Sequence, residues 1–212
     1  MTQQRWHALA PLAGVGFVAL AVAAFIISGE TPDTEDSAQK ILSFYRDNDS
    51  EQIWASAFLA WSSVLLLFFV GVLRSVLRAA EGGLARLSTV AFGGGVVLAI
   101  GMLSFAGFTF ALADTADDLT PAAAQALNAL NSDFFFPVAA GLGTLMLATA
   151  LSSLRSKALP AWLAWPALVL GIAALTPVGF FAFLLFGVWT LVTSVVLWRS
   201  FAAGTPAAPS AP

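Results

Sequence analysis

The chain has 212 residues, of which 59% are hydrophobic and 10% are charged, and its formal net charge is −3 at pH 7. Soluble domains carry about a quarter charged residues, so this composition excludes an ordinary water-soluble domain and indicates one polytopic membrane domain. The chain has no cysteine and a single histidine, His7, which excludes a disulfide framework, thiol chemistry and a histidine-rich metal centre.

Six apolar segments predict an all-α membrane bundle, because a helix of about 17–25 apolar residues spans a hydrocarbon core of about 30 Å. Residues 1–204 are expected to form one six-helix transmembrane domain, and the Ala/Pro-rich stretch 205–212 a disordered tail. The expected spans are approximately 9–28, 53–73, 88–113, 134–154, 159–175 and 180–198.

The first segment has a rival interpretation as a secretory signal peptide, because Ala19 to Ala21 resembles a small-residue cleavage site. The apolar run continues as far as Ile27, however, which favours a membrane span. The last two segments are one long run interrupted at Thr176-Pro177. That interruption predicts a tight helical hairpin of two short spans.

The third segment is the expected hub of the bundle, since no charge occurs between Ser88 and Ala113 and its glycines allow close helix contact in lipid. Small residues recur every four positions both there and in the fourth segment. The predicted helix-packing residues are Ala91, Gly95 and Ala99 in the third segment and Ala140, Thr144 and Ala148 in the fourth.

Two acidic segments, 29–52 and 114–133, each contain a short amphipathic pattern. Apolar residues recur at i, i+3, i+4 and i+7 in the first, and Thr120-Pro121 is a typical helix start in the second. We therefore expect two short amphipathic helices in the outer loops. Their predicted apolar faces are Ala38, Ile41, Leu42 and Tyr45, and Ala123, Ala126, Leu127 and Leu130.

The charges predict the orientation. The six spans place most basic residues, with Glu81 as the one acid, on one side, and the other acids on the opposite side. The positive-inside rule then places both termini in the cytoplasm and the chain in the inner (plasma) membrane. The basic residues on the cytoplasmic side are Arg5, Arg74, Arg78, Arg86, Arg155, Lys157 and Arg199.

Two tryptophans, Trp61 and Trp189, fall well inside expected spans, where an indole N–H needs a partner. They either pack against a hydroxyl of a neighbouring helix or line a ligand cavity. The hydroxyl residues nearest to them in sequence are Ser62, Ser63, Thr190 and Thr193.

Ionisable residues inside the membrane are the usual mark of pumps and ion paths. The expected spans contain none. The carboxylates of the second acidic segment have two interpretations. They are ligands for a hard cation such as Ca²⁺, or they belong to a solvated acidic loop. These carboxylates are Asp114, Asp117, Asp118 and Asp133. No nucleophile, phosphate-loop or nucleic-acid motif occurs, so we expect neither an enzyme nor a cofactor.

The segment LPAWLAWPALVLGIAALTPVGF, followed by Trp189, and the segment ILSFYRDN resemble a loose group of uncharacterised bacterial six-span membrane proteins with a domain of unknown function. The resemblance implies a six-helix membrane protein and no known activity. The expected function is a non-enzymatic structural, accessory or assembly component. The alternative is a carrier or receptor for a small apolar or lipid-like molecule. Expected partners are membrane lipids and a membrane protein or a second copy of the chain, not nucleic acid.

Overall fold

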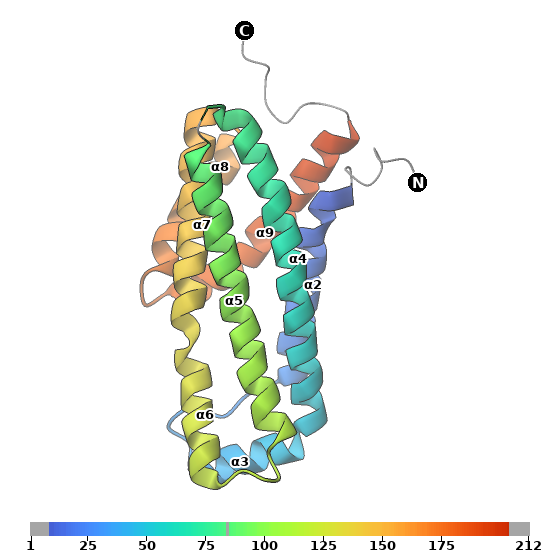
Figure 1. Cartoon of the computed structure of the whole chain (residues 1–212), viewed down its shortest axis with the longest axis vertical. Coiled ribbons are helices and arrows are strands. Elements are labelled where there is room, and N and C mark those ends of the chain that lie inside the picture. The colour runs from blue at the N-terminus through green and yellow to red at the C-terminus, as the bar shows by residue number, and fades with distance from the viewer. Residues whose placement is uncertain (1–8, 84, 204–212) are drawn as a thin grey trace.

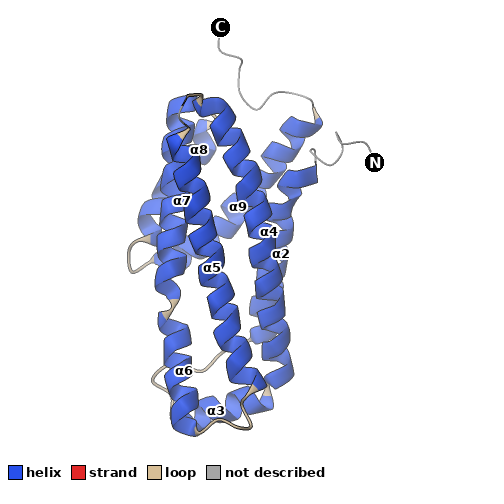
Figure 2. Cartoon of the chain, in the orientation of Figure 1, coloured by secondary structure: helices blue, strands red, loops and turns tan. Residues whose placement is uncertain are grey.

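The structure is a computed structural model that describes residues 9–83 and 85–203, so His7, Arg5 and the expected tail 205–212 lie outside the described residues. The described part is all-helical and contains no strand (Figure 2). Its elements are η1 Ala10–Leu12, α2 Ala13–Ser28, α3 Ala38–Asp47, α4 Asp49–Glu81, α5 Arg86–Asp114, α6 Pro121–Asp133, α7 Phe135–Ser156, α8 Ala161–Ala174 and α9 Gly179–Ala202.

Helices α2, α4, α5 and α7 stand side by side in that order, each antiparallel to the next (Figure 1). Helix α8 packs on α7, and α9 then crosses obliquely behind the row until it contacts α2. The short helices α3 and α6 pack against each other at one end and close the bundle there. The beginning of α2 and the last turn of α9 lie at the opposite end of the bundle.

Within residues 9–83 and 85–203, five helical stretches are long and apolar enough to cross a membrane: Ala10–Ser28, Asp49–Glu81, Arg86–Asp114, Pro121–Ser156 and Gly179–Ala202. The fold is therefore that of a polytopic helical bundle. The fifth expected span, 159–175, is shorter than the sequence suggested. Helix α8 has 14 residues, about 21 Å at about 1.5 Å per residue, which falls short of a core of about 30 Å.

Helix α5 is the hub, since it packs against α4 on one side and α7 on the other. Ala91 and Ala99 are buried, and a Cβ added to Gly95 would meet the side chain of Val70 on α4. The next residue, Gly94, faces α7 instead, where an added Cβ would overlap the backbone of Leu145. Gly94 thus lets the backbones of α5 and α7 approach closely, and Gly95 makes room for the Val70 side chain of α4.

The small-residue stripe expected on α7 is corrected in part. Ala148 is buried, but Ala140 and Thr144 have exposed side chains. The helix turns Gly141 and Leu145 towards α5 instead. Small residues four apart occur on more than one face of this helix, and the face where Gly141 meets Gly94 allows the closest backbone approach.

The cap formed by α3 and α6 has its own apolar core. Ile41, Leu42 and Tyr45 of α3 are buried together with Leu112 at the end of α5, which confirms the predicted apolar face of α3. The predicted helix start also holds, since Thr120 Oγ1 accepts a hydrogen bond from the Ala123 N–H at 3.3 Å.

The predicted face of α6 is wrong in part, although Leu127 does pack, half-buried, against the core of the cap. The buried residues are Ala124, Asn128 and Asn131, whereas Leu130 is 46% exposed. Helix α6 therefore turns its amide side chains inward. The physical reason is that Asn128 and Asn131 find hydrogen-bond partners on other elements, while an Ala-rich helix has apolar residues on every side.

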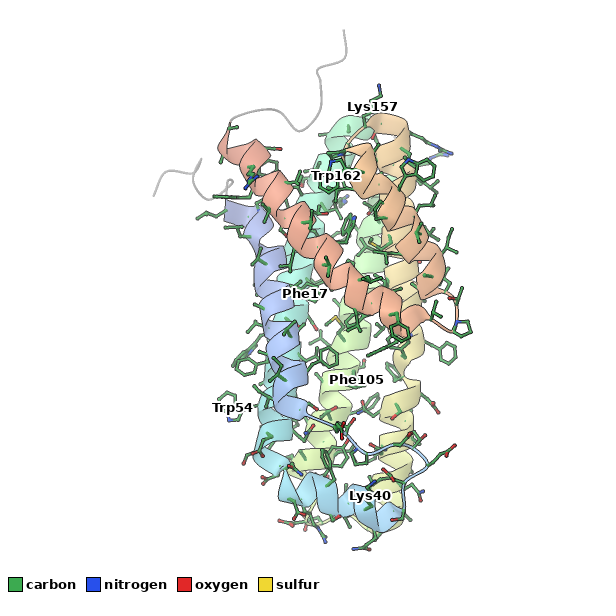
Figure 3. All side chains as sticks on the ribbon, turned by 180° about the vertical axis from the view of Figure 1, so that it is seen from behind. Phe17, Lys40, Trp54, Phe105, Lys157 and Trp162 are labelled. Atoms are coloured by element: carbon green, nitrogen blue, oxygen red, sulfur yellow. The ribbon has the colours of Figure 1, made fainter. Side chains whose placement is uncertain are left out.

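The two ends differ in charge. We call the end that carries the cap the acidic end and the opposite one the basic end; Lys40 and Lys157 mark them in Figure 3. The acids of the acidic end are Glu30, Asp33, Glu35, Asp36, Asp47, Asp49, Glu51, Asp114, Asp117, Asp118 and Asp133. At the basic end, the Glu81 carboxylate accepts hydrogen bonds from the Ser88 N–H at 2.8 Å and from the hydroxyls of Ser88 and Ser152. Glu81 therefore caps α5 and ties α4 to α7.

Candidate functional site

Trp61 lies on the outer surface of α4. Its side chain is 49% exposed and packs edge-on against Phe58, with ring centroids 5.5 Å apart. Ser62 and Ser63 are buried, and both hydroxyls donate to the Leu59 carbonyl of the same helix, at 2.7 and 2.9 Å. Trp61 therefore faces outward, and the two serine hydroxyls are used in intrahelical hydrogen bonds.

Trp189 is buried where α9 packs on α8, and its Nε1–H donates to the Leu163 carbonyl at 3.0 Å. Thr190 and Thr193 are also buried, and their hydroxyls have no hydrogen-bond partner among the described residues. Thr190 packs against α2 at Gly14, where an added Cβ would lie 3.0 Å from Thr190 Cγ2. The structure does not bring Trp61 and Trp189 together, and neither they nor the four hydroxyl residues line the hollows described below.

The carboxylates of the acidic end do not converge. Within the described ranges, no group of three acids or histidines is placed to hold a metal ion. Arg46 Nε lies 3.6 Å from Asp117 Oδ1 and donates to the Ala116 carbonyl at 2.9 Å. Asp117 therefore belongs to a surface contact between α3 and the loop after α5.

A hollow of about 110 Å³ lies beneath the cap, between α2, α4, α5 and α6. We call it the polar hollow. One part of its wall carries hydrogen-bonding side chains, and the other part carries small or apolar ones. The hydrogen-bonding lining includes Tyr45, Ser56, Thr109, Asn128 and Asn131, and the apolar lining consists of Ala24, Phe25, Ala55, Leu59, Phe105 and Ala106.

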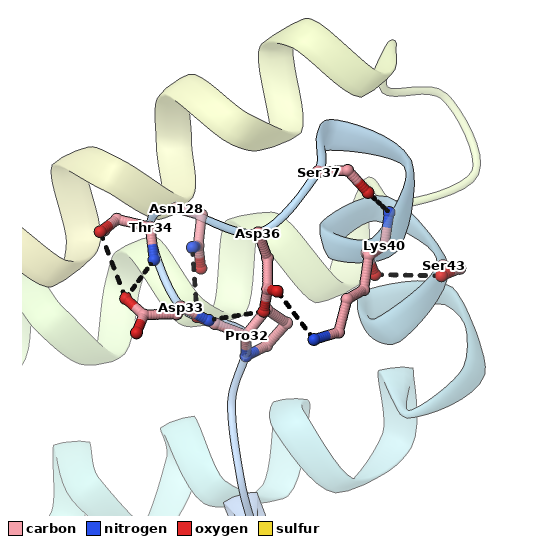
Figure 4. A network of polar contacts seen from close by, with 8 residues as sticks. All are labelled: Pro32, Asp33, Thr34, Asp36, Ser37, Lys40, Ser43 and Asn128. Atoms are coloured by element: carbon pink, nitrogen blue, oxygen red, sulfur yellow. Dashed lines mark hydrogen bonds and ion pairs between the residues drawn. The ribbon is translucent and has the colours of Figure 1, made fainter.

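Three elements meet at Asn128. The Tyr45 phenol of α3 donates to Asn128 Oδ1 at 3.1 Å, and Asn128 Nδ2 donates to the Pro32 carbonyl of the α2–α3 linker at 3.4 Å (Figure 4). The linker is held by its own contacts, among them an ion pair between Lys40 Nζ and Asp36 Oδ1 at 2.8 Å. This pairing, with the Asp33 N–H, lowers the pKa of Asp36. The roof of the polar hollow is thus an ordered network.

Asn131 lies one turn further along α6 and is 5% exposed. Its Nδ2 donates to Thr109 Oγ1 at 3.1 Å, whereas its Oδ1 has no hydrogen-bond partner among the described residues. A buried acceptor without a partner costs about 1–3 kcal/mol. Asn131 lines the polar hollow, and a donor that reaches Oδ1 from the hollow removes this cost.

Tyr45 stays neutral over the physiological range. Burial raises its pKa to about 12, and the neighbouring Asn131 amide partly offsets the rise. The neutral phenol keeps the proton that it donates to Asn128. The hydrogen-bonding wall therefore carries no net charge at neutral pH.

A second hollow of about 80 Å³ adjoins the first and shares Phe25, Leu59 and Phe105 with it. We call it the apolar annex, because only apolar side chains line it. The others are Met102, Phe135, Val138, Phe180 and Phe183. In Figure 3, Phe105 is visible on α5 between α2 and α7, on the acidic-end side of the point where α9 crosses.

Beside the polar hollow, Gln52, a fully buried residue of α4, ties α4 to the end of α2. Ser28 Oγ donates to Gln52 Oε1 at 3.0 Å, and Gln52 Nε2 donates back to the Ser28 carbonyl at 2.9 Å. The second bond satisfies a carbonyl at the end of α2, which has no partner within its own helix. The end of α2 is therefore fixed beside the polar hollow.

The sequence did carry a signal for this site. Asn128 and Asn131 are three residues apart in a short helix composed mainly of Ala and Leu, so they share a face, and Tyr45 is the one tyrosine of the chain. Polar amides on one face of an otherwise apolar helix indicate an internal hydrogen-bonding surface. Apolar periodicity alone leads to the opposite face.

No family model, no curated protein and no solved structure matches this chain.

Proposed function

We propose that the chain is a plasma-membrane protein with both termini in the cytoplasm, as in the bacterial six-span proteins that its sequence resembles. The separation of charge between the two ends supports this orientation, because basic residues remain preferentially on the cytoplasmic side. Helices α2, α4, α5 and α7 cross the membrane in alternating directions in this arrangement.

The α8–α9 hairpin enters from the cytoplasmic side in this proposal. Because α8 has 14 residues, its turn at Thr176-Pro177 lies within the membrane or just reaches the outer boundary. The backbone there is largely satisfied locally, since the Thr176 N–H donates to the Ala173 carbonyl at 3.0 Å and the Gly179 N–H to the Thr176 carbonyl at 2.9 Å. Either depth returns the end of α9 to the cytoplasmic side.

The function that the geometry supports best is a carrier or receptor for a small lipid-like molecule. The observation that carries it is a hollow with one polar and one apolar wall and a buried acceptor, Asn131 Oδ1, without a partner. Small-molecule sites have this form, mostly apolar with a few placed polar groups. The described lining includes no carboxylate, lysine, arginine or histidine, which favours binding over acid–base catalysis.

Filling the hollow tests this function. Ala106 is buried and lines the polar hollow, so Ala106→Leu places a larger side chain where the ligand is expected. Ala140→Leu makes the same chemical change on the exposed side of α7 and serves as the control. Native mass spectrometry of each protein, purified in mild detergent, measures the bound small molecules.

We expect the wild type and Ala140→Leu to retain the same bound amphiphile and Ala106→Leu to lose it, with similar thermal stability in all three. Equal retention by all three proteins, or no bound species in any of them even after incubation with cell lipids, would contradict a binding function.

A structural or assembly role is the second candidate, and the open face of α5 favours it. A Cβ added to Gly93 or to Gly107 would meet nothing within 4 Å, so another helix has room to approach there. Gly107→Leu should then weaken association with a second copy or a partner helix. Cross-linking in native membranes measures this association, and an unchanged cross-linking pattern argues against the role.

A further inference from the structure

The wall of the hollows changes from polar to apolar along every element that lines both of them. The polar residues lie towards the acidic end, and the apolar residues lie deeper in the bundle. The order is Thr109, Phe105 and Met102 on α5, Ser56 and Leu59 on α4, and Asn131, Phe135 and Val138 across α6 and α7. Such a gradient matches a molecule with a polar head and an apolar tail, placed along the helices.

The head of such a molecule is uncharged. The described lining of both hollows has no formal charge, and transfer of an ionised group to such surroundings is strongly unfavourable. The acids of the acidic end surround the cap and further disfavour an anionic head. A phosphate or carboxylate head therefore fits this site poorly.

Asn131 Oδ1, the acceptor without a partner among the described residues, indicates which kind of hydrogen bond the head makes. Asn131 Nδ2 donates one hydrogen bond to Thr109, whereas Oδ1 has no partner among the described residues. A hydroxyl or amide N–H satisfies Oδ1, whereas an ether or ester oxygen has no hydrogen to donate to it. The unpartnered Oδ1 therefore favours a head that donates a hydrogen bond.

The volumes of the two hollows and the opening of the annex determine how much of the apolar tail is enclosed. Hollows of about 110 and 80 Å³ compare with about 150 Å³ for a cavity that binds benzene, so they hold a head and the first part of one chain. Phe25 and Phe180 line the annex and are exposed. The annex therefore opens towards lipid between α2 and α9, where the rest of the tail lies.

We infer that the polar hollow and the apolar annex bind an uncharged, single-chain amphiphile whose head donates a hydrogen bond to Asn131 Oδ1, as a long-chain alcohol or a monoacylglycerol does. This inference rests on the proposed function and names the class of its ligand.

The test uses the full chain in lipid nanodiscs and a photoreactive diazirine analogue of dodecanol. Mass spectrometry of peptides locates the label, which we expect in the segments that carry Phe105 and Val138. Dodecanol, its methyl ether and dodecanoate then compete with the label. The ether keeps the tail and the head oxygen but lacks the donor, and dodecanoate carries a charge.

We expect dodecanol to displace the label at about a tenfold lower mole fraction than the ether or dodecanoate, the effect of one buried hydrogen bond. Asn131→Leu should remove the advantage of the alcohol over the ether and leave displacement through the tail. Because the alcohol–ether comparison needs no variant, the inference remains testable if Asn131→Leu does not fold.

The possible outcomes distinguish a failure of this inference from a failure of the proposed ligand-binding function. Equal competition by alcohol and ether, with the label still in the Phe105 and Val138 segments, overturns the donor head group and leaves ligand binding in place. A label that no competitor displaces, or that spreads over the lipid-facing surface, overturns both.

Discussion

Gly94 of α5 and Gly141 of α7 oppose each other reciprocally. A Cβ on Gly94 would lie 2.9 Å from the carbonyl oxygen of Gly141, and a Cβ on Gly141 would lie 2.9 Å from the carbonyl oxygen of Gly94. Each added carbon would also overlap the backbone nitrogen of a neighbouring residue on the facing helix. The two helices therefore meet backbone to backbone, without side chains between them.

Gly94→Ala should consequently destabilise the protein, because the clash is with backbone atoms that have little freedom to move. We expect a melting temperature in detergent lower by roughly 3–10 °C, from overpacking of about 1–3 kcal/mol. Gly93→Ala is the matched control, since its added carbon meets nothing within 4 Å. Equal melting temperatures for the two variants would show that the α5–α7 contact does not depend on this glycine pair.

Glu81 gives a second prediction, which concerns the basic end. Glu81→Ala removes the acceptor for the Ser88 N–H and for the hydroxyls of Ser88 and Ser152. We expect a loss of about 2–3 kcal/mol in the free energy of unfolding, since hydrogen bonds to charged groups contribute about 1.5–3 kcal/mol each. Glu30→Ala, an exposed acid of the α2–α3 linker, is the control. Denaturant unfolding in mixed micelles measures the difference, and similar losses for both variants would refute a capping role.

The sequence predicted elements whose determinants are local. The face of α3 follows from Ile41, Leu42 and Tyr45 at helical spacing, and the start of α6 from Thr120-Pro121. Apolar periodicity did not predict the face of α6, and the spacing of Asn128 and Asn131 marks a polar face without naming its partner. Asn128 binds Tyr45, a partner 83 residues away in the sequence, and no local pattern reports such a partner.

The site was missed for a related physical reason. Trp61 and Trp189 attract attention because an indole N–H needs a partner, but Trp61 faces outward and Trp189 binds a main-chain carbonyl on α8. Backbone acceptors exist in every helix and leave no mark in the sequence. The apolar annex instead lies where α9 crosses behind the row, and the polar hollow lies beneath the α3–α6 cap. Both depend on how distant helices pack, and the tilt of a helix depends on the packing of the whole bundle.

The orientation gives the third prediction. The chain has no cysteine, so single cysteines report on their own positions. A membrane-impermeant maleimide should label Asp36→Cys and Asp118→Cys in intact cells, but Lys157→Cys only after permeabilisation. Labelling of Lys157→Cys from outside would refute the orientation. Thr176→Cys should react slowly from outside, because α8 is short, and labelling as fast as at Asp118→Cys would indicate a complete sixth crossing.

Tyr45 gives the last prediction, which concerns pH. Its pKa is raised to about 12 in the folded protein, against about 10 for an unfolded chain. Between these values the folded state holds a proton that the unfolded state has lost, so the free energy of unfolding should fall as pH rises from about 10 to 12. The slope should approach about 1.4 kcal/mol per pH unit, with no contribution from this group below about pH 9.

Tyr45→Phe removes the titrating group and should remove this part of the slope, although it also leaves Asn128 Oδ1 without its donor and lowers stability at neutral pH. Because Tyr45 is the one tyrosine of the chain, the near-ultraviolet absorbance of tyrosinate reports on it alone. Native protein should form tyrosinate only near pH 12 and unfolded protein near pH 10. An absorbance midpoint near pH 10 in the folded protein would mean that the phenol is open to water, and that the cap does not seal the roof of the polar hollow.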